Sequence, residues 1–351
     1  MHILQINTEK GWRGGERQTL LSMEGLRDAG VTVTLLCIKN RPLWQRAREA
    51  GFPVVGAAHH LAVLWHLLAH GNRYSILHAQ SSRAFSFAAF AAIYIRTPVV
   101  YTRRVDFVPR GTLTRWKYRR ASALVAISKA IGDILRQSDM GDAVVISSIV
   151  PEVIPNPERS AMLVRELGIE GQRIVGVVAA IVGHKDPLTM IRAAALVTTR
   201  LPDTAFLHFG DGYLRNAAEE ECRRLGLKEH YRLLGHRNAV EDYFPLFDCF
   251  AMSSKEEGLG SSVLDAFRAA IPVASTCAGG LAELVEDRGL VSAVGDPAAL
   301  AENIIRMMSD RALAEGYTAA AYAYVTRHHN RTLLTGRTID LYRKITRPPA
   351  P

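Results

Sequence analysis

The chain has 351 residues, which is more than one ordinary hydrophobic core accommodates, so its length favours two domains. Hydrophobic residues make up 48% and charged residues 22% of the chain, which is typical of a globular protein and excludes a disordered or collagen-like one. No apolar run reaches the ~20 residues of a membrane-spanning helix. The first residues predict a strand and not a signal peptide, so we expect a cytoplasmic protein.

The net charge of +9 lies entirely in the first half of the chain. Residues 1–155 hold 20 Lys and Arg against 10 Asp and Glu, whereas residues 156–351 hold 23 against 24. A basic half can serve nucleic acid, an anionic membrane surface or an anionic substrate. The densest cations are Arg103, Arg104, Arg110, Arg115, Lys117, Arg119 and Arg120.

The four cysteines lie far apart in the sequence and form no CxxC pair. Neither a metal site nor a disulfide framework is therefore expected. We interpret Cys37, Cys222, Cys249 and Cys277 as small residues of the hydrophobic core.

The first half alternates predicted strands and helices. A strand at residues 2–7 precedes a glycine-rich turn at 11–16 and a helix that ends at Gly30. The next strand is expected at 31–38 and the next helix at 42–50. Further strands are expected at 54–55, 76–79, 99–101 and 124–127. Such alternation indicates a parallel sheet covered by helices on both faces.

A second alternating series follows Pro151, Pro155 and Pro157, which mark a linker. Its strands are expected at 174–180, 205–209, 231–234, 249–252 and 273–275, and its helices at 188–199, 217–225 and 261–270. The α/β pattern thus predicts two Rossmann-like domains, residues 1–153 and 154–330. We expect the last helix, within 331–351, to complete the first domain, and ligand to bind in a deep cleft that the two domains face.

Residues 254–283 form the most informative segment. Gly258 and Gly260, after the strand at 249–252, let the backbone approach a ligand closely. The next helix is expected to begin at Ser261. The N–H groups of Ser261, Ser262 and Val263 would then form an anion site at the positive end of the helix.

Two acidic residues flank this helix start. Glu257 lies in the loop and Asp265 lies eight residues further on. A carboxylate at the position of Asp265 can accept hydrogen bonds from both hydroxyls of a ribose. Glu257 would read a sugar hydroxyl, and the helix start would bind the diphosphate between them.

The segment resembles the donor-binding motif of retaining GT-B glycosyltransferases of family 4. That motif is Glu-x7-Glu with EGxG at the first acid, followed by a PVVxxxxGG-like turn. Glu257, residues 272–275 and residues 279–280 match it, as does Glu283. Asp265 departs from the second glutamate and shortens its reach by one methylene.

Further matches extend this resemblance over most of the chain. Residues 12–16 are similar to the GGxE loop that faces the donor diphosphate, and residues 183–186 to the loop with a phosphate-binding lysine, here Lys185. Residues 209–212 and 234–237 match strand ends near the nucleotide base. The donor-binding residues so implied are Gly14, Gly15, Arg103, Gly210, Gly212, His236, Gly258, Leu259, Gly260, Ser261, Ser262 and Asp265.

Three positions depart from the family pattern. Ala180 stands where an arginine often precedes the phosphate-binding lysine. Gln80 and Arg104 stand where the family often has histidines, whereas His78 is interpreted as a packed strand-end residue. Arg103 or Arg104 would replace the missing cation or hold an anionic acceptor.

The resemblance implies a mechanism with Glu257, Lys185 and Arg104 as the catalytic residues. Negative charge develops on the leaving diphosphate, and its stabilisation is the main electrostatic task. The isolated Asp186 and Asp211 do not form a metal-binding pair, so we expect neither a metal nor a cofactor besides the nucleotide-sugar cosubstrate. Retention of configuration is implied by the family alone.

The acceptor is expected to be a glycan or lipid-linked molecule, for instance in lipopolysaccharide or other cell-surface polysaccharide synthesis, reached at the cytoplasmic face of the membrane. The basic first half and its aromatic residues suit such an acceptor. These residues are Trp44, Trp65, Phe85, Phe87 and Trp116.

Three alternatives remain at this stage. A nucleotide-sugar epimerase would share the two Rossmann-like domains but would carry more acid–base residues. A non-catalytic binder would bind a nucleotide-sugar or, through the basic half, nucleic acid, although the acidic pair disfavours nucleic acid. A NAD-dependent oxidoreductase fits least, because residues 11–16 lack GxGxxG spacing.

Overall fold

The computed structural model describes residues 1–346, and contacts divide them into two units. The N-terminal unit comprises residues 1–151 and 328–346, and the C-terminal unit comprises residues 152–327. The chain passes from one unit to the other after residues 151 and 327, within three residues of the boundaries at 153 and 330 that the sequence predicts. Residues 347–351 of the expected C-terminal segment lie outside the described residues.

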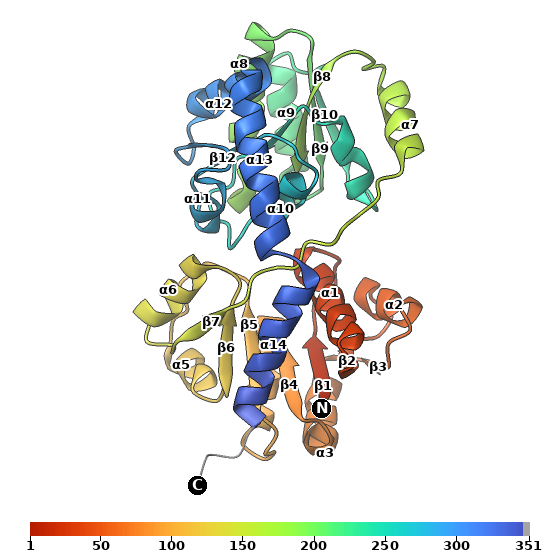
Figure 1. Cartoon of the computed structure of the whole chain (residues 1–351), viewed down its shortest axis with the longest axis vertical. Helices are drawn as coiled ribbons and strands as arrows, with labels where there is room; N and C mark the ends of the chain where they lie inside the picture. The colour runs from red at the N-terminus through yellow and green to blue at the C-terminus, as the bar shows by residue number, and fades with distance from the viewer. Residues whose placement is uncertain (347–351) are drawn as a thin grey trace. The chain divides into compact units, whose positions relative to one another are not determined.

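The N-terminal unit is built on a parallel sheet of seven strands in the order β3-β2-β1-β4-β5-β6-β7 (Figure 1). The strands are β1 (His2–Asn7), β2 (Thr32–Ile38), β3 (Val54–Ala57), β4 (Ile76–Ala79), β5 (Val99–Arg103), β6 (Ala123–Ala126) and β7 (Ala143–Val145). The chain builds outward from β1 in one direction and then from β4 in the other. The adjacent pair β1 and β4 is therefore the switch point, where loops at the carboxyl edge diverge.

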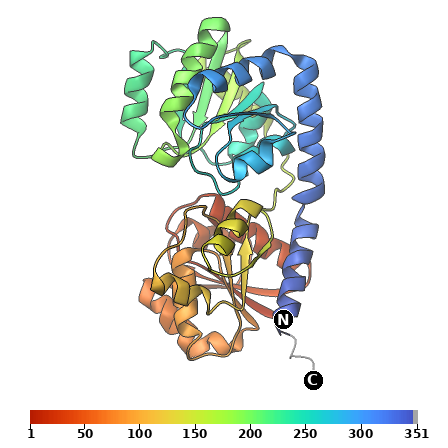
Figure 2. The ribbon, with the colours of Figure 1, turned by 90° about the vertical axis from the view of Figure 1, so that its left-hand side faces the viewer.

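Helices cover both faces of this sheet, as Figure 2 shows for α14 on one side and α3 and α4 on the other. The helices are α1 (Gly14–Asp28), α2 (Pro42–Glu49), α3 (His60–His70), α4 (Ser82–Ala91), α5 (Thr112–Tyr118), α6 (Lys129–Gln137) and α14 (Arg331–Thr346), with the short turn η1 (Gly71–Arg73). Val63, Phe85 and Leu135 belong to the core on one face. Met23 and Tyr342 belong to the core on the other.

The last helix, α14, packs against α1 within the N-terminal unit. Arg331 at its start lies 2.9 Å from Glu24 and 3.2 Å from Asp28, both on α1. Gly25 permits the close approach, because a Cβ there would lie 2.2 Å from the Thr335 Oγ1 atom. A segment more than 300 residues away in the sequence therefore closes one face of the N-terminal sheet.

The C-terminal unit contains a parallel sheet of six strands in the order β10-β9-β8-β11-β12-β13. The strands are β8 (Arg173–Val178), β9 (Thr204–Phe209), β10 (Tyr231–Gly235), β11 (Cys249–Met252), β12 (Val273–Thr276) and β13 (Leu290–Ser292). The helices are α7 (Pro157–Leu167), α8 (Pro187–Arg200), α9 (Arg215–Arg224), α10 (Ser261–Arg268), α11 (Gly280–Val285), α12 (Pro297–Ser309) and α13 (Arg311–His328), with the turns η2 (Gly183–Lys185) and η3 (Val240–Leu246). Here β8 and β11 form the switch point.

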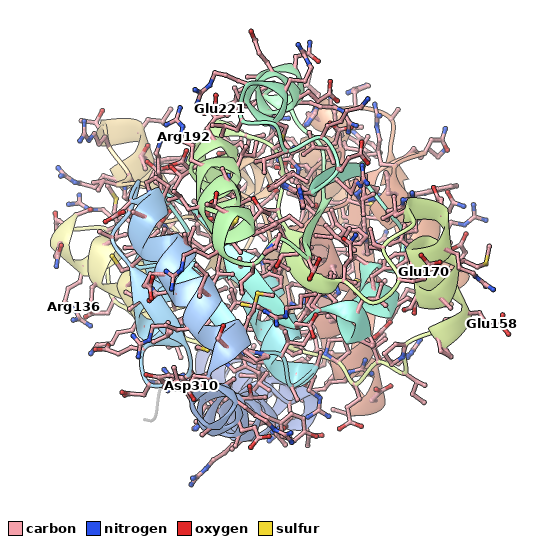
Figure 3. The ribbon with its side chains drawn as sticks, turned by 90° about the horizontal axis from the view of Figure 1, so that it is seen from above. Arg136, Glu158, Glu170, Arg192, Glu221 and Asp310 are labelled. Atoms are coloured by element: carbon pink, nitrogen blue, oxygen red, sulfur yellow. The ribbon has the colours of Figure 1, made fainter. Side chains whose placement is uncertain are left out.

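Local chemistry explains several helix boundaries and contacts. Four helices (α2, α7, α8 and α12) begin with proline, whose fixed φ suits the first helical position. Arg192 of α8 and Glu221 of α9, labelled in Figure 3, pair at 2.7 Å. Hydrogen bonds from Arg224 and Arg192 lower the pKa of Glu221 to about 2, so this carboxylate stays charged and joins the two helices.

The cysteine prediction holds for three of the four residues. Cys37, Cys222 and Cys249 are buried, and burial raises the pKa of each thiol to about 12. The prediction is wrong for Cys277, which is exposed in the loop between β12 and α11. The strand ends at Thr276, so Cys277 falls beyond the sheet that buries its neighbours.

Two buried histidines predict a dependence of stability on pH. Burial lowers the pKa of His78 to about 3 and of His208 to about 4, from an ordinary value of 6.5. The unfolded chain therefore binds more protons than the folded one below pH 6.5, and stability falls as the pH falls from there towards 4. We expect the thermal midpoint to fall between pH 6.5 and 5, with a smaller slope in H78Q and H208Q. Unchanged slopes in both variants would contradict this origin.

Candidate active site

The loops that follow β8 and β11 meet at the switch point of the C-terminal unit. Lys185, in η2 after β8, donates a hydrogen bond from Nζ to Glu257 Oε2 in the loop after β11. The two side chains are only 18% and 14% exposed. The fold thus joins two predicted catalytic residues that lie 72 positions apart in the sequence.

Main-chain contacts hold these two loops together. The Ser253 hydroxyl donates to the carbonyl oxygens of Lys185, at 3.1 Å, and Asp186, at 2.9 Å. The Lys255 N–H donates to the His184 carbonyl at 2.8 Å. The geometry of the Lys185–Glu257 pair is therefore set by backbone and hydroxyl contacts on both sides of it.

A second cation lies beside this pair, and the sequence analysis did not identify it. Lys255 Nζ lies 3.2 Å from Asp186 Oδ2, and the lysine side chain is 53% exposed. Ala180, where the family often has arginine, lies in the neighbouring loop after β8. The only signal in the sequence was the position of Lys255 within the acidic motif, two residues before Glu257.

Helix α10 begins at Ser261, where the sequence places it, and Gly260 caps it with a φ of +86°. The predicted anion site is smaller than expected, because the Val263 N–H already donates to the Gly260 carbonyl at 3.0 Å. Ser261 and Ser262 remain as its predicted donors. Asp265 lies just over one turn into α10 and is half-buried.

The Gly279–Gly280 turn supports the main chain of Glu257. The Gly280 N–H donates to the Glu257 carbonyl at 2.7 Å. A Cβ on Gly280 would lie 2.4 Å from the Gly258 carbonyl oxygen, closer than real Cβ atoms approach. The downstream glycines of the motif thus keep the acidic loop in place. The Leu259 side chain is buried, so only its backbone could make the predicted contact with the donor.

Two glycines after β9 permit close packing of loops. A Cβ on Gly210 would lie 1.9 Å from the Ala179 carbonyl, and one on Gly212 would lie 2.2 Å from the Ile181 carbonyl. These contacts set the loop after β9 against the loop after β8. His236 is exposed after β10, two strands from the switch point. Donor contact by Gly210, Gly212 and His236 stays a prediction.

The N-terminal unit places its predicted residues around its own switch point. Gly14 and Gly15 begin α1 after β1, and the Glu16 carboxylate accepts a hydrogen bond from the Arg13 N–H at 2.8 Å. Burial raises the pKa of Glu16, although the Arg13 N–H and the Arg104 charge oppose the shift. A Cβ on Gly15 would lie 3.7 Å from the Arg104 side chain, so Arg104 packs beside the glycine-rich turn.

Arg104 follows β5, and its side chain is hydrogen-bonded to Gln80, which follows the neighbouring strand β4. Its Nη2 atom donates to Gln80 Oε1 at 2.7 Å, and Gln80 Nε2 donates to Gln5 Oε1 at 2.8 Å. Its Nε atom is buried and has no hydrogen-bond partner among residues 1–346. Burial lowers the pKa of Arg104 to about 10, which still leaves it cationic at neutral pH.

Arg103 has a different environment from Arg104. Its Nη1 atom donates to the Tyr118 hydroxyl at 2.6 Å, and Nη2 donates to the Phe107 carbonyl. Its guanidinium also lies over the Phe107 ring, 5.0 Å from the centroid. These contacts tie β5 to α5 and hold the buried Arg103 side chain in place, and its donor contact stays a prediction.

His78 is part of a buried hydrogen-bond network, as the sequence interpretation of a packed histidine expects. Its Nδ1 atom lies 2.6 Å from the Tyr342 hydroxyl on α14, and Nε2 lies 2.7 Å from Thr102 Oγ1. A cavity of about 40 Å³ lies beside it and reaches Gln80 and Arg104. That volume is large enough to accommodate a water molecule. The C-terminal helix thus contributes directly to the surroundings of Arg104.

Residues 1–346 contain no group of three or more His, Cys, Asp or Glu side chains placed to hold a metal ion. Within the same residues, no helix combines the length and the apolar character needed to cross a bilayer.

Comparison with known families covers both units. Residues 162–324 match the model for glycosyl transferases group 1, and residues 13–149 match that for a glycosyl transferase 4-like domain. The chain is a glycosyltransferase of group 1, the family 4 type. This confirms the family and the enzyme class that the motif at Glu257 predicts.

Individual relatives agree with this assignment. The glycosyltransferase chain is 26% identical over 311 residues to a 2-deoxystreptamine glucosyltransferase from Streptomyces kanamyceticus, covering 84% of this chain and 77% of that protein. It is 26% identical to the lipopolysaccharide core biosynthesis glycosyltransferase LpsE of Rhizobium meliloti over 155 residues, 44% of each chain. A crystal structure of Anabaena HepE with UDP-glucose superimposes with a TM-score of 0.85 and 19% identity, covering 98% of this chain and 100% of that one. The GT-B fold is thereby confirmed.

The contact of Gly280 with Gly258 predicts a specific defect in this glycosyltransferase. We expect Gly280→Ala to displace the Glu257 loop and to weaken nucleotide-sugar binding at least tenfold, measured by calorimetry. Gly316→Ala is the matched control, because nothing lies within 4 Å of a Cβ at that helical position. Alanine is favourable in a helix, so the control should bind normally. Equal affinity in both variants would show that the loop tolerates the extra atom.

Proposed function

We propose that this glycosyltransferase moves a sugar from a nucleoside diphosphate to a glycan or lipid-linked acceptor, with retention of configuration and without a metal ion. The observation that carries the proposal is the Lys185–Glu257 pair beside the start of α10 at the switch point. A cation, a helix N-terminus and a carboxylate are the groups that a sugar diphosphate requires. The UDP-glucose complex of the structurally similar HepE supports a UDP-sugar as donor.

Each group has a distinct task in the proposed transfer. As the bond to the sugar breaks, charge grows on the diphosphate, and Lys185 with the N–H groups of Ser261 and Ser262 stabilises it. Glu257 accepts a hydrogen bond from a sugar hydroxyl and holds the sugar in place. Asp265 accepts from the ribose hydroxyls. Because the lysine also pairs with the glutamate, the two side chains position each other before the donor arrives.

The N-terminal unit contributes the glycine-rich turn and Arg104 to this proposal. The Arg104 guanidinium is preferred over that of Arg103 as the functional cation, because Arg103 uses its donors on Tyr118 and Phe107. Both arginines have a buried Nε without a partner among the described residues, so the preference rests on their Nη atoms. It would stabilise the diphosphate or hold an anionic group of the acceptor.

A lipopolysaccharide or other cell-surface glycan is the acceptor class that we propose, reached by peripheral contact with the cytoplasmic face of a membrane. The similarity to LpsE supports this class, and the excess of cations in residues 1–155 suits an anionic acceptor. We do not propose nucleic acid as a ligand, because the carboxylates at the site repel phosphodiester backbones.

A donor screen tests the proposed binding step. Ligands that bind the native state raise its melting temperature. We expect one class among UDP-, GDP-, ADP- and TDP-sugars to raise the thermal midpoint, equally with and without EDTA. No shift with any of the four classes would overturn the donor assignment. A shift that EDTA abolishes would overturn metal independence.

Removing either member of the catalytic pair should abolish most turnover. We expect Lys185→Ala to lower kcat by about two to three orders of magnitude, which is the scale of one charge-stabilising contact, and Glu257→Ala to abolish transfer without loss of the fold. Single-turnover assays with the donor from the screen would measure both. Normal transfer in Glu257→Ala would refute the site. Conversion of the donor to an epimer without any acceptor would support an epimerase instead.

A further inference from the structure

The outer side of α3 is an apolar stripe that no other described element covers. Leu61, Trp65 and Leu68 are 69%, 66% and 39% exposed. Their spacing of four and then three residues places them on one side of the helix. The opposite side, with Val63 and Leu67, packs into the core of the N-terminal unit.

The neighbouring helix α4 continues this surface. Arg83 on α4 lies 2.8 Å from His60 on α3, so the two helices are in contact along their outer sides. At the end of α4 and just beyond it, Phe90, Ile93 and Tyr94 are 41%, 43% and 68% exposed. The six exposed residues Leu61, Trp65, Leu68, Phe90, Ile93 and Tyr94 are called the apolar face below.

The structure corrects the aromatic set that the sequence suggests. Phe85 is 1% exposed and stacks on Tyr101 with ring centroids 4.2 Å apart, so it belongs to the core. Trp44 lies beside Gly56 and under Arg48. Trp65 is the member of that set within the apolar face.

Charge distinguishes this surface from an ordinary hydrophobic patch. Between Ala50 and Gly132 the sequence has one carboxylate, Asp106, and eleven Lys and Arg residues. Helices α3, α4 and α5 contain no acidic residue. Helix α5 joins the surface through Lys117, whose Nζ donates to Ser86 on α4 at 3.0 Å, and it exposes Leu113 by 70%.

A second copy of this chain is a poor occupant for such a surface. A symmetric contact places the same residues on both sides, so it would bring the cations of α4 and α5 near their own equivalents. An anionic bilayer surface complements both properties, since it accepts apolar side chains at its interface and attracts Lys and Arg through its headgroups.

We propose that the outer surface of α3, α4 and α5 docks this enzyme on an anionic lipid bilayer. The apolar face, which includes Trp65, enters the boundary between headgroups and acyl chains. Arg83, Arg96 and Lys117 meet the phosphate groups around it. This docking rests on the membrane contact in the proposed function and names the surface that makes it. Docking itself requires neither donor nor acceptor.

Sedimentation of the full chain with lipid vesicles tests the docking surface. We expect binding to phosphatidylcholine vesicles that contain phosphatidylglycerol, weak binding to pure phosphatidylcholine, and a loss of affinity at high salt. Leu61→Glu combined with Trp65→Glu should weaken binding at least tenfold. Met162→Glu, on the exposed side of α7 where Met162 is 62% exposed, is the matched control and should bind like the parent chain.

Each other outcome counts against the proposal. Equal binding by the double variant and the parent chain would place the contact elsewhere. Equal affinity for neutral and anionic vesicles would remove the role of charge. Concentration-dependent dimers that the double variant abolishes, without vesicle binding by the parent, would assign the apolar face to self-association. The thermal shift with donor should persist in the double variant, so failure of docking and failure of the donor site are separable.

Discussion

The hydrogen bond between Lys185 and Glu257 joins the loops that follow the adjacent parallel strands β8 and β11. The rest of the site is arranged around this contact. A parallel sheet brings the carboxyl ends of all its strands to one edge, and the strand order reverses between β8 and β11. Ser253 then fastens the two loops through the carbonyls of Lys185 and Asp186. The sheet topology therefore brings Lys185 and Glu257 together, although they lie far apart in the sequence.

Glycines make this arrangement sterically possible. Gly280 lies against the Gly258 carbonyl, and Gly210 lies against the Ala179 carbonyl, at separations that no Cβ atom tolerates. Gly260 adopts a φ of +86°, which lets the chain turn from the acidic loop into α10. The pairing of a carboxylate and a cation thus depends on backbone segments that pack without side chains between them.

The N-terminal unit reaches a comparable result with a polar network. Tyr342, from the last helix, contacts His78, and Gln80 at the end of the same strand holds Arg104. A buried polar group is costly unless it is hydrogen-bonded, so the network also fixes α14 on the sheet. The opposite face of that sheet carries α3 and α4, which expose apolar and cationic residues. The two faces of one sheet therefore differ: one is closed by α1 and α14, and the other carries helices with exposed apolar and cationic residues.

The sequence alone determined the alternation of strands and helices, the two α/β units and the family, because hydrophobic periodicity, proline and glycine signals and the motif at residues 254–283 are all local. It placed β1, β4 and β11 and the start of α10 at their observed positions. It did not predict β7 or β13, whose three residues are too few to show a period. Tertiary structure decided that Lys185 meets Glu257, that Lys255 lies beside them and that Cys277 is exposed. It also separated Arg103, the last residue of β5, from Arg104 just beyond it: Arg103 bonds to Tyr118 and Phe107, whereas Arg104 bonds to Gln80. Tyr118 and Gln80 are distant in the sequence, so only the packed fold shows which arginine each of them contacts.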